Sequence, residues 1–523
     1  MSKKKKKQQK PKMPPLQVGV QIYLLLMFTV FPIYCSDGFF NIRHDRYYLF
    51  LGLSLGGLLL MWAVNFLGSA GKPGSYAQRA AKSLDKKLPP LHLSAIDVGM
   101  LGFLLCCILS TALSKHPVEA LLGTAGRNNG LLLMAVYVTV YFAVSRCGVY
   151  KSFLIPVLAL TTGFVSLVAV LNFAKLDPLN MVAPLTELDK LRFFSTIGNK
   201  NLLSAFLCIT LPVMITWFVR VKCNYTGWLY LAASCLGFAA LMVADSDSGF
   251  LGMGIFAAVS AVWYARDPEK LKKFLLSMTV MVLGARLLNW LPGEHLDMGA
   301  YQAFFVHSPL GLWLLLLLAA KTVLLYVINH KLPGQRFTAT LQWILIGVLG
   351  CILAAAVSAT IYLTFIDPNC PISSLWNLFR IDDKWGTNRG YMWWRSWEIF
   401  SQAPLLQKLV GTGPDTFYYA FEPYFEGLAK LGDSSTNAAH NEYLNYLITL
   451  GGLGLGCYLF TLVGALSRGL YHAKEDPMKA AAAMAVLSCA TQALVNIAQP
   501  ITTPLFIIFL SICASRPQNQ EEK

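Results

Sequence analysis

The sequence predicts an all-α polytopic membrane protein with about 12–14 transmembrane helices and one large extracytoplasmic loop that contains short interfacial helices. Of the 523 residues, 55% are hydrophobic and only 13% are charged, and the mean hydropathy is +0.52. Soluble domains contain about 25% charged residues, so this composition excludes a series of soluble domains. A helix needs roughly 20 apolar residues to cross about 30 Å of hydrocarbon, and runs of this length recur along the chain.

About fourteen runs approach this length, and they must be helical because lipid cannot hydrogen-bond an open backbone. The first eleven are expected at 16–34, 47–66, 96–113, 130–144, 153–173, 202–219, 228–244, 250–264, 274–291, 310–328 and 341–365. After a longer polar stretch, the last three are expected at 443–466, 480–497 and 501–513. The chain therefore divides into a basic tail (1–15), helices 1–11 (16–365), a large loop (366–441), helices 12–14 (442–513) and a second tail (514–523).

Basic residues set the expected orientation, because Lys and Arg are retained on the cytoplasmic side of membrane proteins. With the N-terminus inside, 27 of the 43 Lys and Arg residues fall on the cytoplasmic side. Both termini are then cytoplasmic and the large loop is extracytoplasmic. The net charge of +16 is explained by this distribution, so no nucleic-acid partner is expected.

Fourteen basic residues would still face outside, which suggests an anionic ligand such as phosphate on that side. Arg192 is one candidate, because it precedes a helix entry with Gly198, Asn199 and Asn201. Free backbone N–H groups at such an entry can bind an anion, and Lys200 adds a second cation. An ordinary turn followed by a helix N-cap explains this segment equally well.

Arg389 is the second candidate. Trp393 and Trp397 follow it at helical spacing, which predicts an amphipathic helix at the outer membrane interface. Arg389 shares the stripe of Trp393 and is expected to point along the membrane-facing side, whereas Arg395 lies about 120° away. Because Arg395 has Glu398 three residues ahead as an ion-pair partner, we expect a structural role for Arg395 and a binding role for Arg389.

His440 is the histidine best placed for chemistry, because it stands directly before the run at 443–466 and follows the arginine-bearing loop. A neutral imidazole, with an ordinary pKa of about 6.5, can take a proton from a hydroxyl near neutral pH. Solvated or capping roles explain the other outside histidines. The cysteines and histidines show no metal-ligand spacing, so neither a metal ion nor a cofactor is expected.

Several motifs resemble those of the O-antigen ligases. His440-Asn441, followed after nine residues by Gly451 and after two more by Gly454, is similar to the His-Asn motif of that family. Three further elements resemble landmarks of the wider ligase and polymerase superfamily in the expected order: 126–130, 198–201 and 411–417.

The resemblance implies an inverting, metal-independent glycosyltransferase of the bacterial cytoplasmic membrane, with its catalytic loop outside. It would move a glycan from a polyprenyl (undecaprenyl) pyrophosphate carrier to a hydroxyl of a glycan, lipid or protein acceptor, in the synthesis of cell-surface polysaccharide or glycoconjugates. His440 would then be the general base or position the acceptor. Arg192 and Arg389, with Arg127 as a third candidate, would bind the pyrophosphate and stabilise its growing charge. The supporting motif residues are Asn441, Gly451, Gly454, Gly198, Asn199 and Asn201.

The chain departs from the family pattern in two places. Lys200 stands where the family commonly has Pro, and Asp247-Ser248-Gly249 stands where it has Ser-Arg-Gly. One expected cation is therefore missing, and we hypothesise that Lys200 partly replaces it. Asp245 and Asp247 could instead indicate a divalent cation, although Asp and Ser at a helix start are usually caps.

Two other functions fit a polytopic chain of this kind. A polymerase that joins lipid-linked repeats resembles a ligase closely, and the His-Asn motif favours the ligase. A flippase or transporter of lipid-linked oligosaccharides would be expected to show charges within its helices and two-fold repeats. Only Arg286 and Lys321 among the basic residues fall within expected helices, and no repeat is visible, so a transporter is disfavoured.

Overall fold

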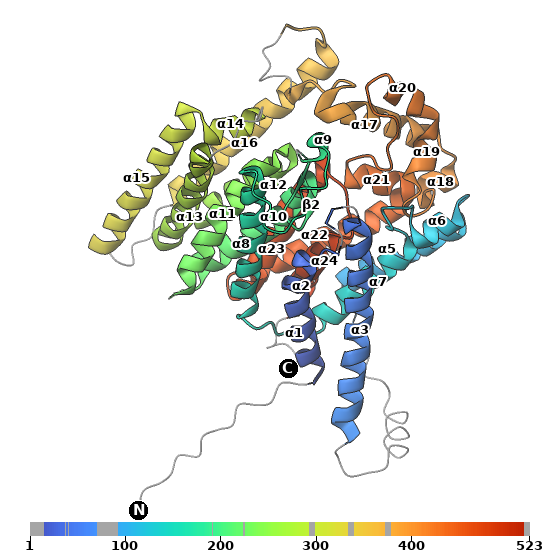
Figure 1. Ribbon diagram of the computed structural model, residues 1–523, viewed down its shortest axis with the longest axis horizontal. Coiled ribbons are helices and arrows are strands. Elements are labelled where there is room, and N and C mark those ends of the chain that lie inside the picture. Colours follow the sequence, from blue (N-terminus) through green and yellow to red (C-terminus); the bar gives the residue numbers. More distant parts are fainter. Residues whose placement is uncertain are drawn as a thin grey trace, which may run out of the picture.

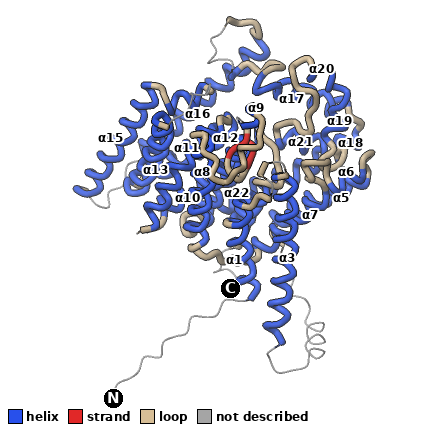
Figure 2. The backbone as a smooth tube through the Cα atoms, in the orientation of Figure 1, coloured by secondary structure: helices blue, strands red, loops and turns tan. Residues whose placement is uncertain are grey.

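The computed structural model describes residues 15–36, 38–39, 41–70, 93–190, 192–222, 225–291, 299–332, 339–371 and 378–516. This part of the chain is helical apart from one two-stranded hairpin and the connecting loops (Figures 1 and 2). Eight of its helices are long and apolar enough to cross a membrane, and three shorter apolar helices accompany them. The predicted all-α, polytopic membrane fold is confirmed.

The first half of the chain forms these elements: α1 (Pro15–Phe28), α2 (Val30–Ile33), α3 (Ile42–Ala70), α5 (Ala95–Ala112), α6 (Pro117–Leu122), α7 (Leu131–Ser145), α8 (Leu154–Phe173), α9 (Glu187–Lys190), β1 (Phe193–Phe194), β2 (Gly198–Asn199), α10 (Lys200–Arg220), α11 (Thr226–Ala244) and α12 (Asp247–Tyr264). The second half forms α13 (Pro268–Leu287), η1 (Leu288–Trp290), α14 (Ala300–Val306), α15 (Pro309–Lys331), α16 (Ala339–Ile361), η2 (Tyr362–Ile366), α17 (Trp385–Gln402), α18 (Leu405–Val410), α19 (Phe417–Phe421), η4 (Glu422–Tyr424), α20 (Phe425–Ala429), α21 (Glu442–Thr449), α22 (Gly451–His472), α23 (Pro477–Gln492), η5 (Ala493–Val495) and α24 (Thr503–Ala514).

Every predicted apolar run coincides with helical structure. The run at 16–34 covers the two helices α1 and α2, and the run at 443–466 is also interrupted. It divides into α21 and α22 at Leu450 and Gly451, where Gly451 has a φ of +68°. A Cβ on this glycine would stand 2.3 Å from the carbonyl oxygen of Leu409 in α18. Only glycine permits both this backbone conformation and this close approach, so the sequence places the break here.

The centre of the membrane part is α10, which packs against α8, α11, α12, α13 and α23. Its residues from Leu202 to Val219 are all buried, which explains a sequence that is apolar around its whole circumference. At the other extreme, α16 has no buried residue and α15 buries only Gly311 and Leu325. These two helices lie at one side of the molecule, where their apolar side chains suit contact with lipid (Figure 1).

The large loop folds into a compact unit of short helices, α17 to α20, which we call the cap (residues 378–441) (Figure 1). The cap packs on α21 around a hydrophobic cluster that is separate from the main core. The buried members of this cluster are Tyr391, Met392, Phe417, Phe421, Leu428, Ala439 and Ile448. Because Ala439 belongs to this cluster, the packing of the cap fixes the chain immediately before His440.

Candidate functional site

His440 stands in a turn between the cap and α21 that is held by hydrogen bonds from two sides. Trp393 Nε1 in α17 donates to the Ala439 carbonyl oxygen at 3.0 Å. Arg127 Nη1, from the loop between α6 and α7, donates to the Asn437 carbonyl oxygen at 2.6 Å. The turn gives His440 a φ of +50°, a left-handed conformation that is uncommon for a residue other than glycine. Such strain persists only where surrounding contacts fix the backbone, and it is concentrated at functional sites.

The motif residues after His440 act on the backbone. Asn441 is the N-cap of α21, and its Oδ1 accepts from the N–H groups of Tyr443 and Leu444 at 3.0 and 3.1 Å. Gly451 permits the contact with α18 described above, and Gly454 also lies where a Cβ would be crowded, 2.5 Å from the Leu450 Cβ. Asn441 therefore caps α21 directly after His440, and Gly451 and Gly454 permit close packing at the break between α21 and α22. Their role as supports of His440 stays a prediction.

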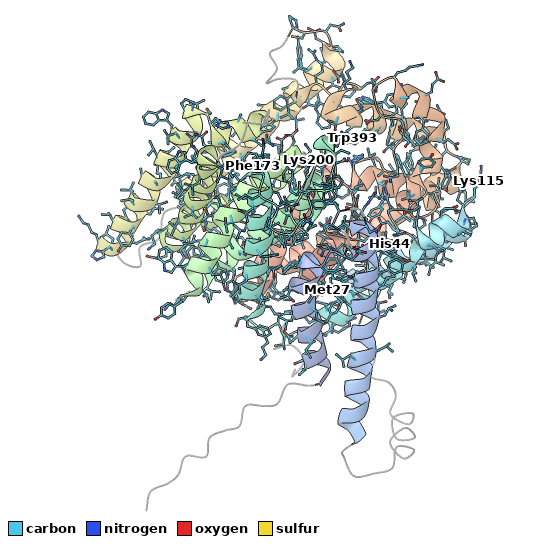
Figure 3. All side chains as sticks on the ribbon, viewed as in Figure 1. Met27, His44, Lys115, Phe173, Lys200 and Trp393 are labelled. Atoms are coloured by element: carbon cyan, nitrogen blue, oxygen red, sulfur yellow. The ribbon has the colours of Figure 1, made fainter. Side chains whose placement is uncertain are left out.

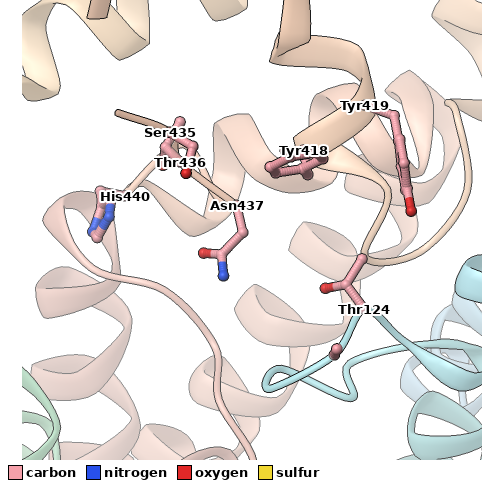
Figure 4. Close-up of a pocket in the computed structure, with 8 residues that line it drawn as sticks. Thr124, Tyr418, Tyr419, Ser435, Thr436, Asn437 and His440 are labelled. Atoms are coloured by element: carbon pink, nitrogen blue, oxygen red, sulfur yellow. The ribbon is translucent and has the colours of Figure 1, made fainter. Parts of the chain in front are cut away.

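His440 lines two cavities. The first, the cap cavity, has a volume of about 440 Å³ (Figure 4). Its other lining residues are Thr124, Ala125, Tyr418, Tyr419, Ser435, Thr436 and Asn437. The second, the hairpin cavity, has a volume of about 410 Å³. Its other lining residues are Phe39, Ile42, Arg43, Leu185, Asp189, Phe193, Asn199, Asn201, Leu202, Asn496, Ile497 and Gln499. A group bound in either cavity can therefore contact the same imidazole.

The environment of His440 keeps its ring neutral. Burial, together with the positive charges of Arg389 and Arg127, lowers the pKa of His440 to about 3. An imidazolium would lose solvation here and face two cations, so the unprotonated ring predominates near neutral pH. The residue keeps part of its surface open and lines both cavities, so a bound group can reach it.

The charge of Arg389 acts on His440, and its predicted contact with pyrophosphate stays a prediction. Gly386, Thr387 and Asn388 have left-handed backbone conformations, and the regular part of α17 begins at Arg389. Burial lowers the pKa of Arg389, and the charge of Asp247 opposes that shift. Among the described residues, its buried Nε has no hydrogen-bond partner. A buried guanidinium nitrogen without an acceptor is suited to a bound anion.

The face of α17 is predicted only in part. Arg389 and Trp393 both turn toward the site, but the expectation that their stripe faces the membrane is wrong for Trp393, which bonds to the turn of His440. The reason is that the cap has its own core, which the inner side of α17 covers. Arg395 Nη1 lies 2.5 Å from Glu398 Oε2, so the predicted ion pair is confirmed. The Arg395 guanidinium also lies over the Tyr391 ring, 5.2 Å from its centroid.

Arg127 makes one ion pair and one hydrogen bond within the protein. Its side chain is 1% exposed, and its Nε lies 3.1 Å from Oδ1 of Asp415, whose side chain is 0% exposed. The other carboxylate oxygen of Asp415 accepts from Thr124 N, Thr124 Oγ1 and Asn129 N at 2.8, 3.0 and 3.1 Å. With its bond to the Asn437 carbonyl, Arg127 is placed to position the turn of His440, and its predicted contact with pyrophosphate stays a prediction.

The segment at 193–199 is a short hairpin in which Phe193 pairs with Asn199 and Phe194 with Gly198. Gly198 has a φ of +88°, which favours glycine. Asn199 is the N-cap of α10, and its Oδ1 accepts from Asn201 N at 2.9 Å, so the N-cap interpretation is confirmed. The side chains of Asn199 and Asn201 also line the hairpin cavity together with His440, so a cap and a contact with a ligand are compatible here.

Arg192 and Lys200 flank this hairpin, and the Lys200 N–H bonds to the Arg192 carbonyl oxygen at 2.9 Å. Lys200 and Trp393 lie toward the same end of the molecule (Figure 3). The Arg192 side chain is exposed, and Lys200 Nζ lies 3.8 Å from Asp245 Oδ2. Neither is among the described residues that line the two cavities. Their predicted contacts with pyrophosphate thus remain predictions.

Asp245, one of the two acidic residues that could indicate a divalent cation, makes its contacts within the protein. Asp245 Oδ1 accepts from Gly299 N at 3.1 Å, and its Oδ2 faces Lys200. The N-cap of α12 is Ser246, whose hydroxyl donates to Asn201 Oδ1 at 2.8 Å and makes no capping bond. Across the described ranges, no group of three or more His, Cys, Asp or Glu side chains is arranged to hold a metal ion.

Arg43 is a residue that no motif identified. It belongs to α3, yet it lines the hairpin cavity with His440. Its Nη2 lies 3.6 Å from the position of a Cβ on Gly126, so the guanidinium rests against the turn that contains Arg127. The count of outward-facing basic residues includes Arg43, but only the packing of α3 beside this turn distinguishes it from the others.

Comparison with known proteins gives one family. Residues 303–459 match the family described as O-antigen ligase, and a search of curated proteins found no match. The matched segment contains Arg389, His440, Gly451 and Gly454, so the resemblance noted in the sequence is confirmed there. At the level of the family, this supports a multi-pass membrane glycosyltransferase of the O-antigen ligase and polymerase type that acts on lipid-linked glycans.

Proposed function

We propose that this protein transfers a glycan from a polyprenyl pyrophosphate carrier to an acceptor hydroxyl at the extracytoplasmic face of the bacterial cytoplasmic membrane, with inversion and without a metal ion. The observation that supports it best is the position of His440, a neutral imidazole that lines two separate cavities and lies within the electrostatic reach of Arg389. A transferase needs two substrates to meet at one base. A single imidazole between two cavities meets this requirement.

The hairpin cavity suits the donor. Its lining combines the cation of Arg43 and the carboxylate of Asp189 with polar amides and with apolar side chains from several segments. The Asp189 carboxylate accepts a hydrogen bond from the Thr186 hydroxyl at 2.7 Å. An isoprenoid pyrophosphate complements such a lining, because it combines an anionic head with an apolar chain. Arg389 adds a second cation near His440, and guanidinium groups match phosphate oxygens with two parallel hydrogen bonds. We assign Arg43 and Arg389 to the pyrophosphate, with Arg192 and Lys200 as candidates at the rim.

The reaction follows from these positions. His440 accepts the proton of the acceptor hydroxyl as the hydroxyl oxygen attacks the anomeric carbon. The bond between the anomeric carbon and the pyrophosphate oxygen breaks, and the electron pair leaves with polyprenyl pyrophosphate. Arginines near the leaving oxygen stabilise the charge that grows on it. Attack from the side opposite to the leaving group inverts the anomeric configuration.

The experiment is transfer by the purified full-length protein, given undecaprenyl-pyrophosphate glycan and a panel of acceptors. Wild-type protein should release undecaprenyl pyrophosphate and form glycosylated acceptor, whereas His440→Ala should form neither while it expresses and melts like wild type. Normal transfer by His440→Ala would refute the mechanism. The panel should include a second lipid-linked repeat, because elongation of that acceptor alone identifies a polymerase and use of other acceptors identifies a ligase.

A further inference from the structure

We infer that the cap cavity is the acceptor subsite, and that it binds an uncharged sugar ring against the face of Tyr418. The inference rests on the proposed function, because it names the acceptor class for the same imidazole. It concerns the side of His440 that faces the cap, whereas the pyrophosphate site above concerns the side that faces the hairpin.

The chemistry of the lining distinguishes the two cavities. The cap cavity is lined, besides His440, by the hydroxyls of Thr124, Ser435 and Thr436, the amide of Asn437, the methyl of Ala125 and two tyrosine rings. None of these side chains is charged. A sugar ring offers hydroxyls at its edge and C–H groups on its face, which match hydroxyl and amide partners and an aromatic surface. No cation is among the described residues that line this cavity, and Arg127 behind its wall is paired with Asp415, which makes the cavity a poor anion site.

The two rings are held in place by their own contacts. Tyr419 stacks on His116 with ring centroids 3.8 Å apart and an interplanar angle of 10°. Tyr418 meets Tyr419 edge to face at 5.5 Å and packs against Phe425 at 4.9 Å. Its side chain remains 37% exposed, so a surface of the ring is open to a ligand. Rings fixed before binding lose little freedom when a sugar is bound, which favours affinity.

The position of the cavity fits the reaction. Its volume of about 440 Å³ lies in the usual range of about 300–1,000 Å³ for small-molecule sites. His440 and Tyr418 form parts of its wall, together with the loop segment at 435–437 (Figure 4). A sugar stacked on Tyr418 can therefore present a hydroxyl toward the imidazole that accepts its proton.

The test is binding of the labelled full-length protein to an array of neutral oligosaccharides and their phosphorylated counterparts. Wild type should bind a subset of the neutral glycans, Tyr418→Phe should keep this binding, and Tyr418→Ala should weaken it about tenfold, as expected for the loss of an aromatic contact. Ala125→Phe, which fills the cavity from an exposed position, should abolish it. Tyr225→Ala is the matched control, because Tyr225 is 93% exposed and directly precedes α11, away from the cap cavity lining.

Binding of phosphorylated glycans in preference to neutral ones would overturn the inference, as would binding by Tyr418→Ala or Ala125→Phe equal to wild type. The assay is independent of turnover. If His440→Ala binds the array normally but transfer is also normal, the proposed catalytic function fails while the acceptor subsite stands. If transfer depends on His440 but array binding is indifferent to Tyr418 and Ala125, the subsite fails and the function stands.

Discussion

Replacement of Arg127 by Met tests whether this arginine positions the catalytic turn or binds the donor. Arg127 and Asp415 are 1% and 0% exposed and lie 3.1 Å apart, so removal of the cation leaves a carboxylate buried without its counter-charge. Breaking a buried pair in this way costs about 3–5 kcal/mol. The three hydrogen bonds to Asp415 Oδ2 from Thr124 and Asn129 reduce the cost toward the lower end of that range.

The assay is thermal unfolding of the purified protein, followed by donor KM in the transfer reaction. Arg127→Met should lower the melting temperature strongly, and the double variant Arg127→Met/Asp415→Asn should recover most of the loss because both charges are then removed. Asn is chosen because Asp415 has a φ of +60°, which Asn tolerates. An Arg127→Met variant that melts like wild type but has a much higher donor KM would refute the positioning role and return Arg127 to the pyrophosphate site.

Four further predictions follow from the site and its supports. Because the pKa of His440 is lowered to about 3, the ring stays neutral as the pH falls through 6.5. We therefore expect kcat/KM to remain level down to about pH 5. A fall of kcat/KM toward acid pH with its midpoint near 6.5 would contradict this. Arg389→Ala should reduce kcat/KM for the donor about 10- to 100-fold, because charge-assisted hydrogen bonds are lost. Arg395→Ala should change kcat/KM for the donor little, because the ion pair of Arg395 is partly exposed. Equal effects of the two substitutions would disprove the assignment. Gly451→Ala should lower the melting temperature, since its Cβ would stand 2.3 Å from a backbone oxygen, and an unchanged melting curve would show that α18 can yield. Lys430→Cys, at a side chain that is 73% exposed, should react with an impermeant maleimide added outside intact cells, and reaction only after permeabilisation would invert the topology.

The helices could be predicted from the sequence because burial in lipid or in protein imposes long apolar runs. The break between α21 and α22 could not, since it depends on the approach of α18 to Gly451, a contact between segments about forty residues apart. The prediction that the Trp393 side of α17 faces the membrane failed for a similar reason. Helical spacing correctly placed Arg389 and Trp393 on one side of the helix, but spacing cannot tell whether that side meets lipid or the core of a cap.

Residues of the candidate site could be proposed from the sequence where a local motif exists, and not elsewhere. His440 and Asn441 are adjacent in the sequence, and the structure shows the cap of α21 that explains the asparagine. The pairing of Arg127 with Asp415 joins residues 288 positions apart, so charge counting could only offer Arg127 as one outward cation among many. Arg43 could not be identified from the sequence either, because no residue beside it in the chain indicates that α3 reaches the hairpin cavity.

The buried ion pair also connects the two halves of the proposed mechanism. Thr124 donates through its N–H and its hydroxyl to Asp415, and the same residue lines the cap cavity. Arg127, on the other side of that carboxylate, bonds to the Asn437 carbonyl, and Asn437 also lines the cavity three residues before His440. One charged pair therefore fixes the wall of the acceptor subsite and the turn of the base together. If this coupling holds, any residual transfer by Arg127→Met should show a raised acceptor KM with an unchanged donor KM, the reverse of the pattern expected for a ligand of pyrophosphate.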